Sequence, residues 1–233
     1  MKNLPLLPVL LVFFALTVSA QNPNLDYKVG IKLYNHSTYE ITSEDRTLGY
    51  HTETRNYHLL RLSPAVQWKT GKGNFHEIEL SDFRLNNKES VRTPTSWQNP
   101  GGMSILSSSF ISARYEYILN ARKMAESKWV PSLGFAINPY FQRQYISPLA
   151  SNQFATTDNS FGVRFFVVPR ISYHFNNRLF ADLYIPVCVS DSRLSALYQE
   201  DPNIPVRERR ESDFTINAFP KLFSARVGMG LKL

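Results

Sequence analysis

The last eleven residues, Phe223-Ser-Ala-Arg-Val-Gly-Met-Gly-Leu-Lys-Leu233, decide how the rest of the chain is interpreted. Every second residue is apolar: Phe223, Ala225, Val227, Met229, Leu231 and Leu233. The residues between them are charged, polar or glycine. This period of two predicts a β-strand with one apolar and one polar face. Because chain ends fray unless a neighbour holds them, we expect this strand to pair within a sheet up to its last residue.

Seven further segments show the same alternation and are predicted to be strands. They span residues 28–34, 60–68, 75–85, 111–119, 129–141, 163–175 and 179–189. The apolar phase changes at Ser81-Asp82, which predicts a β-bulge there. Pro169 and Pro186 lie inside predicted strands and also indicate bulges, because proline cannot donate a ladder hydrogen bond. A kink at Pro220 would connect residues 214–218 to the last strand, which has the opposite phase.

The connections between the eight predicted strands are sorted by length. Those after strands two, four and six are short, and the first of them is the glycine turn 70–74. Those after strands one, three, five and seven are long, at about 36–56, 86–110, 142–160 and 190–213. An even strand number also places both termini at the short-turn end. A β-sandwich has no reason to sort its loops in this way.

The alternating strands, the closing strand and the sorted loops together resemble the small eight-stranded β-barrel proteins of bacterial outer membranes. The resemblance covers residues 21–233. It implies an all-β chain that forms a single antiparallel up-and-down transmembrane β-barrel, with short periplasmic turns and long extracellular loops. It also implies that 223–233 is the signal read by the outer-membrane assembly machinery, although Leu233 stands where the family usually has an aromatic residue.

A lipocalin-like barrel in water, with its apolar face turned inward, is the alternative fold. Two features favour the inverted, membrane arrangement. The polar face is rich in glycine and serine, which suits a crowded lumen. Aromatic residues such as Trp68, Trp129 and Tyr173 gather near strand ends, where the interfacial girdles of membrane barrels lie.

Residues 1–20 predict a secretory signal peptide, which leaves 21–233 as the barrel domain. Lys2 precedes an apolar run from Leu4 to Val18, and Val18-Ser19-Ala20 fits the small-residue rule for cleavage before Gln21. No later stretch approaches the ~18 apolar residues of a membrane helix. The expected location is therefore the outer membrane, reached by export.

Composition restricts the partners. Without Lys2, the chain carries 25 Lys and Arg against 19 Asp and Glu. This basic character suits outer-membrane lipid and lipopolysaccharide phosphates, whereas nucleic acid is not expected for an exported protein. Cys188 is the single cysteine, and the five histidines show no metal-ligand spacing, so neither a cofactor nor a metal is expected.

The polar face of the predicted strands carries long charged residues of both signs. We expect them to interlock in a narrow lumen that has room for little beyond side chains. A three-residue turn after strand six would place Arg170 opposite Asp182. The predicted network consists of Arg61, Glu79, Arg114, Glu116, Arg164, Arg170, Asp182 and Arg226.

Three functional hypotheses follow. The first is a non-enzymatic outer-membrane protein that serves envelope structure, adhesion or surface interaction through its extracellular loops, with an unidentified ligand. The second is a transporter or narrow channel for a small or apolar solute. The third is a lipid-modifying enzyme, for which Ser172, His174 and Glu116 are the candidate catalytic residues. No motif surrounds these three residues, so we predict no catalytic site.

Overall fold

The computed structural model describes residues 28–46, 50–70, 73–92, 103–120, 127–148, 154–220 and 222–233. The expected signal peptide lies outside these residues. The regular structure within them is β-strand, in ten segments: β1 (Val29–Arg46), β2 (Tyr50–Lys69), β3 (Phe75–Arg92), β4 (Met103–Asn120), β5 (Trp129–Pro148), β6 (Thr156–His174), β7 (Leu179–Tyr184), β8 (Val187–Gln199), β9 (Arg210–Ala218) and β10 (Leu222–Lys232). The described part of the chain contains no helix that is long and apolar enough to cross a membrane.

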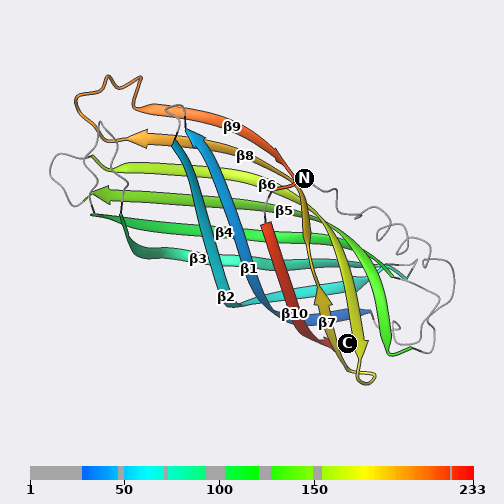
Figure 1. Cartoon of the computed structure of the whole chain (residues 1–233). Coiled ribbons are helices and arrows are strands. Elements are labelled where there is room, and N and C mark those ends of the chain that lie inside the picture. The colour runs from blue at the N-terminus through cyan, green and yellow to red at the C-terminus, as the bar shows by residue number, and fades with distance from the viewer. Residues whose placement is uncertain are drawn as a thin grey trace.

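The ten segments form a closed barrel of eight antiparallel strands (Figure 1). Each of β1 to β6 pairs with its neighbour in sequence. The seventh strand consists of β7 and β8, and the eighth consists of β9 and β10. The last segment, β10, pairs with β7 on one side and with β1 on the other, from Gly30↔Lys232 to Glu40↔Leu222. The eight-stranded barrel closed by the C-terminal strand is therefore confirmed.

Proline breaks the last two strands. Ile185-Pro186 separates β7 from β8, and Phe219-Pro220 separates β9 from β10, with Phe219 at a φ of 51°. The expected kink at Pro220 and the expected bulge after Leu80 are both present. The bulge expected at Pro169 is wrong in its pairing with β5, which runs through Leu133↔Pro169 without a shift. Pro169 instead accepts a hydrogen bond from Ile185 at the break between β7 and β8.

The strands are much longer than the alternation indicated. Six of them, β1 to β6, contain 18 to 20 residues each, whereas a tilted membrane strand needs only ~9–11. Much of each expected long loop is strand, so the barrel wall continues far beyond a membrane at the long-loop end. The alternation fades there, and in the described outer parts of β3 to β6 residues of both faces are at least partly exposed.

The two faces of the barrel are inverted relative to a protein folded in water. Along β1, Ile31 and Leu33 point outward and are about half exposed, while Lys32 between them is buried. Along β3, Ile78 is exposed and Glu77 and Glu79 are buried. Burying charges while exposing large apolar side chains is unfavourable in water. The apolar belt therefore faces lipid, and the fold is a transmembrane β-barrel.

The closing strand has the predicted two faces. Val227, Met229 and Leu231 are exposed on the outside, and Gly228 and Gly230 face the lumen. A Cβ atom on Gly228 would lie 2.2 Å from the ring of Tyr34, and one on Gly230 would lie 2.3 Å from the ring of Phe180. The inward glycines are required because bulky side chains from other strands already fill this space.

Candidate functional site

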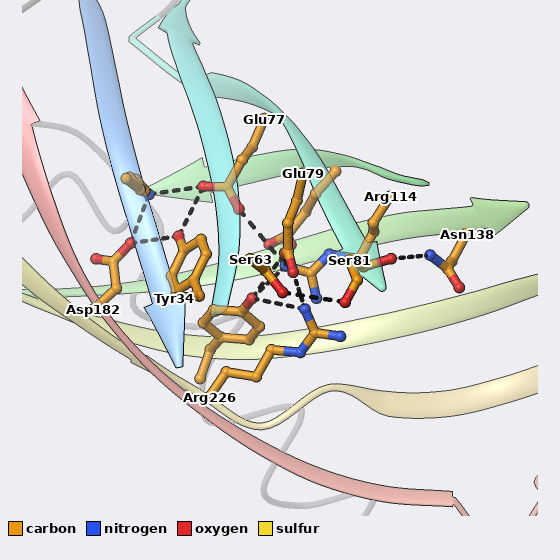
Figure 2. A network of polar contacts seen from close by, with 12 residues as sticks. Tyr34, Ser63, Glu77, Glu79, Ser81, Arg114, Asn138, Asp182 and Arg226 are labelled. Atoms are coloured by element: carbon orange, nitrogen blue, oxygen red, sulfur yellow. Dashed lines mark hydrogen bonds and ion pairs between the residues drawn. The ribbon is translucent and has the colours of Figure 1, made fainter. Parts of the chain in front are cut away.

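A network of eight buried or nearly buried charged side chains crosses the half of the barrel nearer the short turns, which we call the stem. Figure 2 shows part of this network. Four are cations and four are carboxylates, so the formal charges cancel. They project inward from β1, β3, β4, β6, β7 and β10, and we call them the lumen network: Lys32, Arg114, Arg170, Arg226, Glu77, Glu79, Glu116 and Asp182.

Arg170 lies at the centre of the lumen network. Its Nη1 donates to Glu77 at 3.0 Å and to Asp182 at 3.3 Å, and its Nη2 donates to Glu116 at 2.9 Å. The guanidinium also lies over the ring of Tyr184, 4.5 Å from its centroid. One planar fork thus links three carboxylates that come from three different strands, a geometry suited to arginine rather than lysine.

Arg114 connects Glu116, one of the partners of Arg170, to a further carboxylate, Glu79. It forms ion pairs with Glu79 and, at 3.3 Å, with Glu116, and its Nη2 donates to the hydroxyl of Tyr184 at 2.6 Å. Glu79 also pairs with Arg226 of the closing strand. This pair connects β3 to β10 across the lumen, because these two strands are not neighbours in the sheet.

Lys32 and Tyr34, both on β1, complete the network. The Lys32 ammonium lies 2.7 Å from Glu77 and 2.6 Å from Asp182. The Tyr34 hydroxyl lies 3.0 Å from a carboxylate oxygen of each of the same two acids and accepts from Arg170 at 3.2 Å. Multiple hydrogen bonds of this kind are what make a buried set of charges tolerable.

The lumen is also filled on both sides of the network. An apolar cluster lies among the inward residues nearest the short turns and consists of Phe75, Ile118, Val130 and Phe180. Further along the strands, inward hydroxyl and amide groups of β3, β4 and β5 bond to one another: the Ser81 hydroxyl lies 2.8 Å from that of Ser112, and Asn138 donates to Ser81 at 2.7 Å. Apolar, ionic and neutral polar layers thus follow one another along the axis.

Two of the predicted network residues lie elsewhere. Arg61 on β2 pairs with Asp82, and Arg164 on β6 pairs with Asp191 at 3.1 Å. Both pairs are partly exposed and lie nearer the long-loop end. The structure brings the other six together: Glu79, Arg114, Glu116, Arg170, Asp182 and Arg226.

The predicted register of β6 and β7 is wrong by two residues. Arg170 is opposite Tyr184, and Asp182 is opposite Ser172, because the turn is centred on Asn177, with His174 opposite Phe180, rather than on Asn176. Phe175 N–H closes it by donating to the Leu179 carbonyl at 3.0 Å. Arg170 nevertheless reaches Asp182 diagonally, at 3.3 Å.

The predicted network omits four residues that complete it or its hydrogen bonds: Glu77, Lys32, Tyr34 and Tyr184. The alternation of residues 28–34 nevertheless led us to expect Lys32 on the inward, polar face. Each of the four lies an even number of residues along its strand from another residue of the polar, inward face. Glu77, for example, is two residues before Glu79. Strand phase alone could therefore have identified all four.

The three residues considered for lipid hydrolysis are not assembled as a catalytic site. Glu116 is bound by Arg170, whereas His174 stacks on Phe180 with ring centroids 5.5 Å apart. Within the described residues, neither ring nitrogen of His174 has a hydrogen-bond partner. The described residues also contain no group of three or more His, Cys, Asp or Glu side chains placed to hold a metal ion.

Comparison with known proteins gives matches in structure but not in sequence. No protein-family model and no curated protein sequence matches the chain. The outer membrane protein OprG from Pseudomonas aeruginosa aligns with a TM-score of 0.53 at 13% identity, over 89% of this chain and 96% of that one. Neisserial surface protein A aligns with a TM-score of 0.40 at 10% identity, over 88% and 97%. Ail, the attachment invasion locus protein of Yersinia pestis, aligns with a TM-score of 0.40 at 6% identity, over 89% and 99%.

The match to OprG agrees with the features derived above: eight antiparallel strands, an apolar exterior, a polar interior and a C-terminal strand that pairs with the first. The chain therefore has the fold of the small eight-stranded outer-membrane β-barrel proteins.

Proposed function

We propose that this chain is a non-enzymatic integral protein of the bacterial outer membrane whose stem is closed and whose outward-facing part serves envelope structure, adhesion or surface interaction. The short turns and both termini would face the periplasm, and the extended strands would face outside. The observation that carries this proposal is the filled lumen, because a stem without a water column leaves only the outer surface and the wall to act.

The lumen network supports a closed stem in two ways. Its carboxylates and cations neutralise one another in side chains that are almost fully buried, with Arg114 at 2% and Glu116 at 0% exposure. Next to the network, the side chains of Phe75, Ile118, Val130 and Phe180 form a buried apolar cluster. An ion would have to break buried salt bridges and then cross an apolar layer, and each step has a high cost.

The outward end supports a role in surface interaction. The tip between β8 and β9 is ordered by its own hydrogen bonds: Arg209 donates to the carbonyls of Ile204, at 2.8 Å, and Pro202, at 3.1 Å. Val206 is 73% exposed beside Arg207. Ordered tips with exposed apolar and cationic side chains suit contact with other molecules, since little conformational entropy remains to be lost on binding.

Planar bilayer recording tests the closed stem. Purified protein should show no steady, porin-like conductance, and it should migrate on gels in the heat-dependent way of folded membrane barrels. Large stable channels in the unmodified protein would contradict the proposal and favour transport through the lumen.

Cell attachment tests the role of the outward end. Cells that display the chain should attach to a host-cell monolayer or to one another more than cells that lack it. Replacing residues 200–209 by a glycine-serine linker should reduce attachment while the amount of folded barrel is unchanged. Equal attachment by all three cell types would leave envelope structure as the remaining role.

Transport of a small apolar solute through the barrel wall is the second candidate. One observation favours it: β2 and β3 are paired only from Ala65↔Glu79 to Lys69↔Phe75, which leaves a cleft between them nearer the long-loop end. Faster uptake of a small aromatic hydrocarbon by cells that express the chain, abolished by Leu62→Trp in the cleft, would place transport first.

A further inference from the structure

The wall of the barrel is incomplete between β2 and β3. Their pairing covers five residue pairs, while β1 pairs with β2 as far as Arg46↔Tyr50 and β3 pairs with β4 as far as Arg92↔Met103. The interruption begins where β3 bulges, between Leu80 and Asp82. The β1–β2 and β3–β4 hairpins therefore separate from one another between Ala65 and the long-loop end, while the two strands of each hairpin remain paired.

A cleft of about 290 Å³ opens at this point, close to the lower limit of ~300 Å³ for small-molecule pockets. Successive residues of a strand point to opposite faces of a sheet. Five successive residues of β3 line the cleft and they come from both faces of the wall: Leu80 and Phe83 are exposed outside, whereas Ser81 is buried. The lining is Arg61, Leu62 and Pro64 from β2 and Leu80, Ser81, Asp82, Phe83 and Arg84 from β3.

The inner side of the cleft carries an excess of positive charge. Asp82 pairs with Arg61 and lies 3.5 Å from Arg84, so two guanidinium groups share one carboxylate. Arg84 lies over the ring of Phe110, 5.1 Å from its centroid, and its buried Nε–H has no hydrogen-bond acceptor among the described residues. An anion in the cleft would neutralise the extra cation and accept from this group.

The outer side of the cleft is apolar and faces lipid. Leu62 is 69% exposed and Phe83 is 56% exposed, with Leu80 beside them. The outward apolar series of β3 ends at Leu85, and exposed Asn86, Asn87 and Lys88 follow. The cleft thus lies at the upper margin of the apolar belt, where the headgroups of the outward-facing lipid leaflet begin.

We propose that this cleft binds one lipid of the outward-facing leaflet by its phosphate. The phosphate would enter between the strands and take bidentate hydrogen bonds from Arg84 and Arg61, while the first part of the acyl chain lies on Leu62, Leu80 and Phe83. Arginine forks match phosphate geometry better than lysine does. This inference rests on the outward orientation in the proposed function, and it adds the ligand class and the position of its site.

Native mass spectrometry of the purified full chain in a neutral maltoside detergent provides the test, with dodecyl phosphate as the probe. We expect one bound dodecyl phosphate per chain. Because Arg84→Gln removes a charge-assisted hydrogen bond to the phosphate, it should weaken binding by about tenfold or more. Arg84→Lys should restore only part of the affinity. Arg164→Gln is the matched control, because Arg164 also pairs with one aspartate but lies outside the cleft. This variant should bind dodecyl phosphate with the affinity of the unmodified protein.

Two competitors decide which part of the ligand is recognised. Inorganic phosphate should displace the probe only at far higher concentration, since it lacks the tail. Equal competition would assign the cleft to free anions and overturn the lipid site. Equal binding of dodecyltrimethylammonium, or unchanged affinity in Arg84→Gln with heat-modifiable migration retained, would also overturn it. None of these results depends on conductance, so the closed stem is judged separately.

Discussion

Replacing Arg170 by methionine tests whether the lumen network holds the barrel together. The substitution keeps much of the side-chain volume but leaves three cations against the four carboxylates of the network. Glu77, Glu116 and Asp182 each lose a partner that lies within 3.3 Å of them. Breaking a buried ion pair on one side costs ~3–5 kcal/mol, against ~5–15 kcal/mol for the unfolding of a whole domain. We expect about that loss in the free energy of unfolding.

The matched variant is Arg170→Met combined with Glu116→Gln, which restores three cations against three carboxylates. Glu116→Gln alone completes a double-mutant cycle. If uncompensated charge is the cause, the double variant should recover much of the stability lost in Arg170→Met. Urea unfolding in phospholipid vesicles, followed by tryptophan fluorescence, measures all four proteins. Wild-type stability in Arg170→Met, or strict additivity in the cycle, would refute the reasoning.

Two further predictions concern the membrane belt and the topology. Ile137 lies on β5 between exposed apolar neighbours on both adjacent strands, so Ile137→Arg should destabilise the barrel by ~2–4 kcal/mol. Ser107→Arg, nearer the long-loop end of β4, should be nearly neutral. Equal folded yields of the two variants would refute the position of the belt. An epitope tag at Asn203 should be labelled on intact cells, whereas one at Met124 should require permeabilisation, and labelling of Met124 on intact cells would reverse the topology.

The fold could be predicted from the sequence because the alternation of apolar and polar residues, with a period of two, identifies both the strands and their two faces. A membrane barrel needs lipid outside and side chains inside, so each strand records its two faces in alternate residues, as Ile31, Lys32 and Leu33 do. The same phase placed Arg114, Glu116 and Arg170 inside. The proline at position 220 lies at the break in the last strand, as its missing N–H led us to expect, whereas Pro169 interrupts no pairing between β5 and β6.

The register and the outer half could not be obtained in this way. The turn after β6 is centred on Asn177 and is held by the Asn176 side chain, which accepts from the N–H groups of Arg178 and Leu179 at 2.8 and 2.7 Å. Alternation says nothing of such a turn. In the described outer parts of β3 to β6, residues of both faces are at least partly exposed, so these extensions have no apolar face and were expected to be loops. The separation of β2 from β3 depends on pairing between strands, which the phase of a single strand does not record.

The position of the cleft follows from how the lumen network is distributed. The network reaches into the lumen from β1, β3, β4, β6, β7 and β10. Of its carboxylates on β3, Glu79 is the one nearer the long-loop end. The paired part of β2 and β3 ends at that same residue, opposite Ala65. The inward residues of β2 here, Ser63, Ala65 and Gln67, are neutral, so β2 contributes no ion pair to the network. Beyond Glu79, among the described side chains, β2 is joined to β1 by strand pairing and to β3 by the Arg61–Asp82 pair and by the Ser63 hydroxyl, which donates to the Ser81 carbonyl at 3.1 Å. The wall is fixed by the buried lumen network nearer the short turns, whereas the described side chains of β2 and β3 at the cleft are joined by one hydrogen bond and one partly exposed ion pair. The wall can therefore open at that level without loosening the stem, and a lipid phosphate that enters there would replace the missing strand pairing with contacts to both edges.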